Sequence, residues 1–267
     1  MTFPMMRSGA LMLAAISGMI TVPALAQEQQ REPRRVRVAL GAQIVPDFPG
    51  GEDFDVRPLF DIDLSRGTTP FEFEAPDESM GFGIVEAGRF SIGPALNFEG
   101  KRSSADVGGN LPKVPFTVEA GAFMEYDVAD SFRLRAELRK GLGGHDGWIG
   151  SFGPDYVARD GDKWLFSIGP RLTWANNKYH DAYFSIAPED AAASGLPAYN
   201  AGSGILAAGV AAGLDAQLTE KWGIYSFAKY DRLTADAADS PIVERYGSRD
   251  QFSAGLGVSY TFTRSRN

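Results

Sequence analysis

The chain has 267 residues, of which 44% are hydrophobic and 22% charged, with a formal net charge of -8 and no cysteine. The apolar content is enough to fill a core, and the lack of cysteine excludes a disulfide-stapled module and a cysteine-based metal site. The acidic balance excludes a nucleic-acid-binding protein, because such proteins present basic surfaces to phosphate.

Residues 1–26 have the features of a secretory signal peptide. Arg7 precedes an apolar run, residues 9–22, and the sequence Ala24-Leu25-Ala26 matches the small-x-small pattern that signal peptidase cleaves. A membrane anchor is the alternative, but the run is shorter than the roughly 20 apolar residues of a spanning helix. The sequence therefore predicts export, with cleavage after Ala26.

Residues 27–35 are polar and contain Pro33, so we expect a short flexible periplasmic leader. After it, no apolar stretch is long enough for a transmembrane helix. If the mature chain spans a membrane, it has to do so as a β-barrel, because the hydrocarbon core tolerates no unpaired backbone groups.

Between residues 36 and 262, apolar and polar residues alternate with period two in segments of about ten residues. In residues 164–174, one face carries Trp164, Phe166, Ile168, Pro170, Leu172 and Trp174. Residues 116–126, 132–139 and 251–262 alternate in the same way, and the Ala-rich stretch 205–218 is the one serious candidate for a helix. The pattern predicts an all-β protein.

The spacing of aromatic residues distinguishes a membrane barrel from a soluble β-domain. Trp164 and Trp174 are ten residues apart on the apolar face, as are Phe116 and Tyr126. Ten residues of a tilted strand, at about 3.3 Å each, span roughly the 25 Å apolar band of an outer-membrane barrel. We therefore expect two aromatic girdles and an apolar outer face. A soluble barrel or sandwich would instead bury these rings.

Alternating short and long connections predict the topology. Tight links at 65–69, 86–88, 127–130, 159–163 and 219–221 alternate with longer loops, of which 175–203 is the longest. Short turns belong on the periplasmic side, so the sequence predicts a closed antiparallel transmembrane barrel of twelve strands with both termini periplasmic. The third and fourth strands, 71–75 and 81–85, are short. Residues 183–186 are expected to form an extracellular hairpin.

Several runs resemble the MipA/OmpV family of outer-membrane proteins. They are residues 194–204 (SGLPAYNAGSG), 236–243, 247–262, 143–145, 167–170 and 174–175. The similarity extends over essentially the whole mature chain, whereas the acidic segment 72–78 and the tail 263–267 depart from the family pattern.

The resemblance implies a non-enzymatic outer-membrane protein. Family members are described as scaffolds that link a murein lytic transglycosylase to a peptidoglycan synthase, and others are linked to envelope stress. A small-solute channel, an adhesin or an envelope-stress protein remain alternatives. A barrel protease or lipase belongs to another class and would need a catalytic constellation that the sequence does not offer.

We predict no catalytic, cofactor-binding or metal-binding residues. His145 and Asp146 lie in a Gly-rich stretch, 141–150, that we interpret as a flexible surface loop. Acidic pairs are candidate calcium ligands but lack the spacing of a calcium loop, so a solvated acidic rim is favoured; they are Asp61 and Asp63, Glu52 and Asp53, and Asp236 and Asp239.

The alternation directs many charged residues inward. The positive set is Arg37, Arg57, Arg133, Arg135, Arg139, Arg171 and Lys229. The negative set is Asp61, Asp63, Glu99, Glu119, Glu125, Glu137, Asp215 and Asp231. Because the signs nearly cancel, paired ladders that stabilise the barrel are favoured over an ion-selective pore, which would show an excess of one charge.

Two segments are candidate contacts for a protein partner. The leader 27–35, with Arg31, Arg34 and Arg35, offers basic groups on the periplasmic side, although such a leader is also a plausible spacer. The loop 175–203 is the rival, but the topology places it outside the cell. Lipid of the outer membrane is the other expected partner. The sequence leaves the oligomeric state and conduction through the lumen open.

Overall fold

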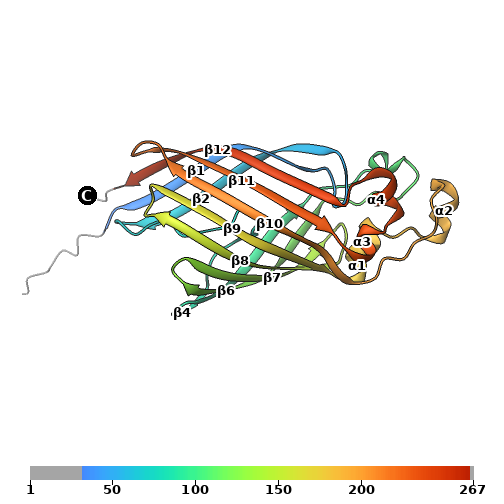
Figure 1. Cartoon of the computed structure of the whole chain (residues 1–267), viewed down its shortest axis with the longest axis horizontal. Coiled ribbons are helices and arrows are strands. Elements are labelled where there is room, and N and C mark those ends of the chain that lie inside the picture. Colours follow the sequence, from blue (N-terminus) through green and yellow to red (C-terminus); the bar gives the residue numbers. More distant parts are fainter. Residues whose placement is uncertain (1–31, 265–267) are drawn as a thin grey trace, which may run out of the picture. The chain divides into compact units, whose positions relative to one another are not determined.

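The structure, a computed structural model, describes residues 32–264. The predicted signal peptide, its cleavage site after Ala26 and the first part of the leader, including Arg31, lie outside the described residues. In the described part, the chain forms an antiparallel sheet of twelve strands that curls into a barrel-like wall, with short helices gathered at one end (Figure 1).

Ten of these twelve strands have ten or more residues, as the period-two segments predict. They are β1 (Arg34–Pro46), β2 (Phe54–Arg66), β5 (Phe90–Glu99), β6 (Thr117–Ala129), β7 (Phe132–Leu142), β8 (Trp148–Asp160), β9 (Trp164–Ala175), β10 (Gly204–Gln217), β11 (Trp222–Leu233) and β12 (Asp250–Arg264). The two short strands are β3 (Met80–Gly81) and β4 (Val85–Ala87). The Ala-rich stretch 205–218 lies almost entirely in β10, which rules out a helix there.

Neighbouring strands follow the order β2-β1-β12-β11-β10-β9-β8-β7-β6-β5-β3, and β4 also pairs with β5. The first and last long strands lie side by side, with Val36 opposite Phe262. Every ladder is antiparallel, and the tight turns all lie at the end of the wall opposite the helices (Figure 1). We call these the turn end and the cap end.

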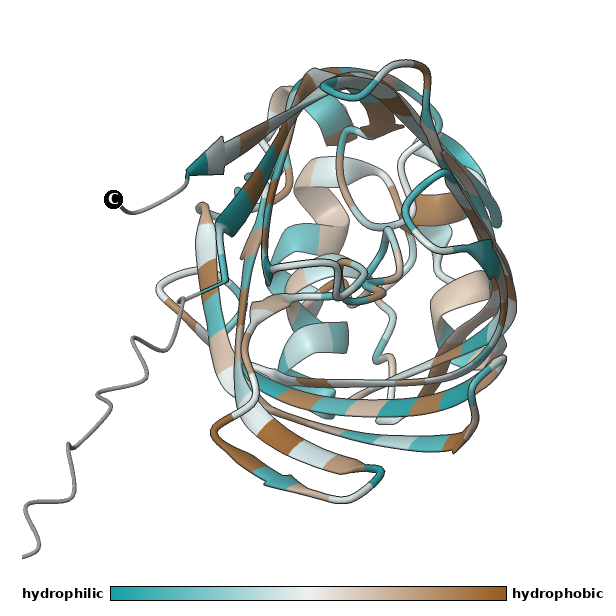
Figure 2. Cartoon of the chain, turned by 90° about the vertical axis from the view of Figure 1, so that its left-hand side faces the viewer, coloured by the Kyte–Doolittle hydropathy of each residue, from teal (hydrophilic) through white to brown (hydrophobic). Residues whose placement is uncertain are grey.

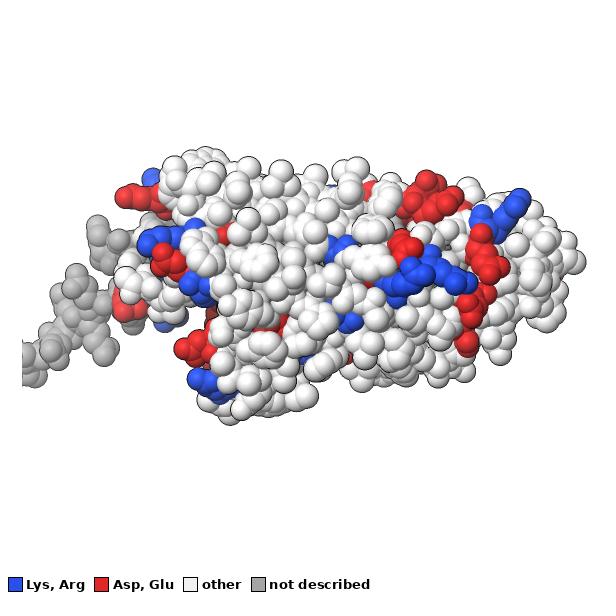
Figure 3. Space-filling model, in the orientation of Figure 1, with Lys and Arg blue, Asp and Glu red and all other residues white. Residues whose placement is uncertain are grey.

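The outer face of the wall is apolar. Trp164 and Trp174 are exposed, as are Phe116 and Tyr126, which contradicts the alternative of a soluble domain with these rings in its core. On the face shown in Figure 3, charged side chains gather towards the two ends, and the stretch between them is mostly uncharged. Figure 2 views the wall from the turn end, with strands that alternate in hydropathy along their length. Such a surface suits hydrocarbon.

Two of the predicted strands are wrong. Residues 71–75 form no strand but run inside the wall, and 81–85 is reduced to β3 and β4 with an irregular stretch between them. Consequently no ladder among the described residues joins β2 to β3, β4 or β5. The predicted closed barrel is thus confirmed only as a curled sheet, and we call its interruption the seam. The cause is the set of polar contacts that draws residues 70–79 inward.

The cap end holds the helices α1 (Asn177–Tyr183), α2 (Pro188–Ser194), α3 (Ala235–Ala238) and α4 (Pro241–Tyr246), and the 3-10 turn η1 (Ala105–Val107). The predicted hairpin at 183–186 is wrong, since Tyr183 ends α1 and Ile186 forms a single bridge with Tyr199. The leader also ends earlier than predicted: Arg34 and Arg35 belong to β1, where Arg35 pairs with Asp162 at 2.6 Å.

Candidate functional site

A ladder of ion pairs lines the inner face of β7. Period-two alternation places Arg133, Arg135, Glu137 and Arg139 on one face of this strand, and all four are buried. Arg135 Nη1 lies 2.6 Å from Glu125 Oε1 on β6, and Arg139 Nε lies 2.9 Å from Glu119 Oε2. The inward direction predicted for these charges is confirmed.

The same pairing continues round the wall. Arg37 on β1 lies 2.7 Å from Asp63 on β2 and 3.6 Å from Asp215 on β10. On β11, Lys229 lies 3.0 Å from Asp231. Because buried charges are tolerated when each has a close partner, these ladders stabilise the wall from within.

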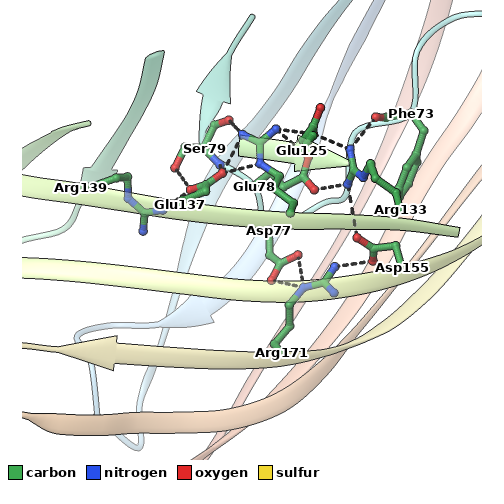
Figure 4. A network of polar contacts seen from close by, with 11 residues as sticks. Phe73, Asp77, Glu78, Ser79, Glu125, Arg133, Glu137, Arg139, Asp155 and Arg171 are labelled. Carbon is green, nitrogen blue, oxygen red and sulfur yellow. Dashed lines mark hydrogen bonds and ion pairs between the residues drawn. The ribbon is translucent and has the colours of Figure 1, made fainter. Parts of the chain in front are cut away.

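Residues 70–79, which we call the plug segment, contact charged side chains on the inner face of the wall, and Figure 4 shows Phe73, Asp77, Glu78 and Ser79 among them. Arg171 Nε donates to Asp77 Oδ2 at 2.9 Å, and Lys229 Nζ lies 3.2 Å from the same oxygen. Glu78 pairs with Arg133 and lies 3.6 Å from Arg135. Ser79 Oγ donates to Glu137 Oε2 at 2.6 Å. These charge-assisted contacts therefore bind the plug segment to three different strands, β7, β9 and β11.

The first half of the plug segment is held by its backbone and its rings. Phe71 N donates to Asp162 Oδ1 at 2.9 Å, and Arg159 Nη1 donates to Phe71 O at 2.9 Å. The guanidinium of Arg133 lies 4.2 Å from the ring centre of Phe73 and donates to its carbonyl at 2.9 Å. Phe71 itself is buried beneath the guanidiniums of Arg35 and Arg37. These cation-π contacts add to the ion pairs.

The sequence analysis did not identify three of the carboxylates that pair with arginine in this network. Asp77 and Glu78 lie in the acidic segment that departs from the family pattern, and Asp155 on β8, which lies 2.7 Å from Arg171, is not among the predicted inward charges. One signal was available: the acidic stretch 72–78 sits beside short predicted strands in a chain whose inner face is rich in arginine. A loop that is acidic in such a chain is a candidate for insertion into the lumen.

At the cap end of the lumen, His145 is buried, so its assignment to a flexible surface loop is wrong. Its Nε2 lies 3.0 Å from Glu119 Oε1, and Gly147 N donates to its Nδ1 at 3.0 Å. The ring of Tyr179 packs against it with 4.7 Å between centroids. Asp146 remains exposed, so the two residues do not form a base and its orienting partner.

The cap has an apolar core of its own. Tyr179 and Tyr183 from α1, and Phe184 directly after it, pack against the ends of β8 to β11 and against α3 and α4. Arg102 ties the loop after β5 to this core by donating to Tyr183 O at 2.8 Å and Pro112 O at 2.9 Å. Burial lowers the pKa of Arg102 to about 10 and raises the pKa of the Tyr183 hydroxyl. The cap therefore closes its end of the lumen with packed side chains.

Two cavities lie at opposite ends. A cavity of about 650 Å³ in the cap is lined by Arg102, Asp181, Ile186 and Tyr199 among others. A second, of about 460 Å³, opens beside the plug segment at the turn end, where Phe82, Phe123 and Arg133 form part of its wall. The plug segment lies between them.

Three of the acidic residues that we considered as candidate calcium ligands have other contacts. Asp63 pairs with Arg37, Asp236 accepts from Gly202 N at 2.7 Å, and Asp239 pairs with Arg249 at 3.1 Å. Residues 32–264 contain no group of three or more His, Cys, Asp or Glu arranged to hold a metal ion. The same residues contain no helix long and apolar enough to cross a membrane, a finding that says nothing of a β-barrel.

Comparison with solved structures returns outer-membrane barrels at low identity. A NanC porin shares 11% identity over 86% of this chain and 98% of its own, with a TM-score of 0.41. An outer membrane channel from Pseudomonas putida F1 shares 10% over 86% and 96%, with a TM-score of 0.38. The N-terminal β-barrel domain of Pseudomonas aeruginosa OprF shares 12% over 87% and 100%, with a TM-score of 0.28.

The comparison with family models shows which family the chain belongs to. No curated protein matches the chain. The model of the family described as MltA-interacting protein MipA matches residues 38–262, which extend from the fifth residue of β1 to two residues before the end of β12. This span confirms the resemblance seen in the sequence, and the chain belongs to the MltA-interacting protein MipA family.

Proposed function

We propose that this protein is a non-enzymatic outer-membrane scaffold that tethers peptidoglycan-remodelling enzymes, namely a murein lytic transglycosylase and a peptidoglycan synthase. The observation that carries the proposal is a wall with an apolar outer face whose lumen is filled by ion pairs and the plug segment. The printed name of its family, MltA-interacting protein, supports a lytic transglycosylase as one partner.

The proposal includes export and orientation. Residues 1–26 act as a signal peptide that is removed after Ala26, and residues 36–262 form the barrel in the outer membrane. The turn end faces the periplasm and the cap faces outward, as the short turns of such barrels require. Partner enzymes then meet the turn end, where exposed residues include Glu220 and Lys221.

A small-solute channel is the rival function. The plug segment crosses the lumen at the level of Arg133 and Arg171, and the cap core closes one end. Both features oppose steady conduction, because a conducting pore needs a continuous polar path. They favour a scaffold over a permanently open channel.

The test is capture of partners from solubilised envelopes by the tagged full-length protein, set beside conductance in planar bilayers. We expect a murein enzyme to be recovered and no steady conductance to be seen. The double variant Glu220→Ala/Lys221→Ala at the turn end should weaken capture, whereas the charge-matched cap variant Lys178→Ala/Glu189→Ala should leave it unchanged. Steady conductance with no murein enzyme recovered would reverse the assignment in favour of a channel.

A further inference from the structure

One strand is missing from the wall at the seam. Every ladder is antiparallel, so the strand direction reverses at each step along the order from β2 to β3. The order has ten such steps, and β2 and β3, at its two ends, therefore run in the same direction. These two edges therefore cannot pair directly in an antiparallel barrel. A single strand running the opposite way would complete the sheet, and the chain between β2 and β3 is the plug segment with its preceding turn.

The plug segment has the composition of that missing strand. Phe71, Phe73 and Ala75 alternate with Glu72 and Glu74, which is the apolar-out, polar-in pattern of the other strands. A tight turn already joins it to β2, since Thr69 N donates to Arg66 O at 3.1 Å and Gly67 has a φ of 57°. In a two-residue hairpin the turn fixes the register of the strands that follow.

That register matches side chain to side chain. Continued from the Arg66–Thr69 pair, it sets Phe71 opposite Leu64 and Phe73 opposite Ile62, residues of β2 that are 71% and 62% exposed on the outer face. Cross-strand apolar pairs of this kind stabilise antiparallel sheets.

We propose that the plug segment exchanges between two positions: the lumenal position seen in the structure, and an in-sheet position in which it pairs with β2 and closes the seam. In the second position the contacts of Asp77 and Glu78 with Arg171 and Arg133 are lost. The exchange closes the side of the barrel while clearing the middle of the lumen.

Opposing charges keep the two positions in balance. The in-sheet register places Glu72 opposite Asp63 and Glu74 opposite Asp61, and like charges directly opposite destabilise a sheet. The lumenal position instead gives Asp77 two cationic partners and Glu78 two more. The apolar match with β2 favours closure, whereas the acidic residues favour the lumen.

Engineered disulfides can trap each position, because the chain has no cysteine of its own. A Cβ on Gly213 of β10 would lie 3.4 Å from Cδ of Pro76, so Pro76→Cys/Gly213→Cys reports the lumenal position. Ile62→Cys/Phe73→Cys reports the in-sheet position, in which the register brings the two Cα atoms to roughly 5.5 Å. Leu138→Cys/Phe73→Cys, with Leu138 on the outer face of β7, is the control that neither position brings together.

The experiment oxidises each pair in the full-length protein in isolated outer membranes and quantifies the disulfide by mass spectrometry. We expect both reporter pairs to form and the control pair not to form. Adding Glu72→Gln/Glu74→Gln should raise the yield of the Ile62–Phe73 disulfide about fivefold, since it removes two like-charge pairs. Adding Asp77→Asn/Glu78→Gln should lower the yield of the Pro76–Gly213 disulfide.

Two results would overturn the exchange. One is a Pro76–Gly213 disulfide that forms while the Ile62–Phe73 pair stays reduced in every variant, which would mean a fixed plug. The other is absence of the Pro76–Gly213 disulfide, which would mean that the lumenal position is not populated. Neither result depends on capture of a murein enzyme, so failure here is separate from failure of the scaffold proposal.

Discussion

The wall and the cap of this protein are built in opposite ways. The wall places leucine, valine and aromatic rings outside and buries arginine with glutamate inside, whereas the cap buries Tyr179, Tyr183 and Phe184 in an apolar core. Each region buries what its own surroundings exclude: hydrocarbon accepts the apolar face of the wall, and water surrounds the cap. The wall therefore buries charged side chains and exposes apolar ones, whereas the cap does the opposite.

The largest loss of stability is expected from substitutions among the buried charges of the wall. Glu137→Ala leaves Arg135 and Arg139 without a carboxylate that lies within hydrogen-bonding reach of both. Removing one partner of a buried pair costs about 3–5 kcal/mol. Reversible unfolding in phospholipid vesicles measures the loss. The double variant Glu137→Leu/Arg139→Met should regain much of it, and equal loss in both variants would argue that size rather than charge matters here.

A charge on the outer face tests which solvent the wall meets. Val210 lies in the middle of β10 and is 38% exposed, and Val210→Arg should destabilise the protein by about 2–4 kcal/mol if that face meets hydrocarbon. Ile205, equally exposed but near the cap end of the same strand, is the matched control. Ile205→Arg should cost about 0–1 kcal/mol. Equal costs at the two positions would contradict a membrane-embedded wall.

In the cap, a smaller effect is expected from the helix start. Asn176 precedes α1, and its side chain accepts from Tyr179 N as a cap. Asn176→Ala should cost about 1 kcal/mol and loosen α1 without changing the wall. Hydrogen exchange resolves the two regions: faster exchange in residues 177–183 with unchanged exchange in β9 is the expected pattern. Loss of protection in both would show that cap and wall unfold together.

The smallest expected effect is that the stability of the cap depends on pH. Burial lowers the pKa of His180 in α1 below its usual value, so the folded cap binds a proton less readily than the unfolded chain. Stability is therefore lost as pH falls through the unfolded pKa, roughly 6.5, towards the lower folded value. The protection factors of cap amides, corrected for the intrinsic exchange rate at each pH, should fall below about pH 6.5. The variant His180→Phe should flatten that dependence, and an unchanged profile would assign it to another group.

The sequence by itself determined the wall. Alternation in segments such as 164–174 and 251–262 predicted β9 and β12, and the aromatic spacing predicted which face points outward. The inward charges of β7 followed from the same period. These features are local, because successive side chains of a strand point to opposite faces whatever the partner is.

Only the tertiary structure decided the plug segment and the cap. Residues 71–75 alternate like a strand, yet the segment that contains them lies in the lumen because Glu78 meets Arg133, 55 residues further along the chain. His145 is buried because Glu119 and Tyr179 come from distant segments. Such contacts join residues that are far apart in the sequence, and no local pattern links them. A period-two pattern therefore predicts that a segment can form a strand, but not whether ion pairs with distant residues hold it in another position.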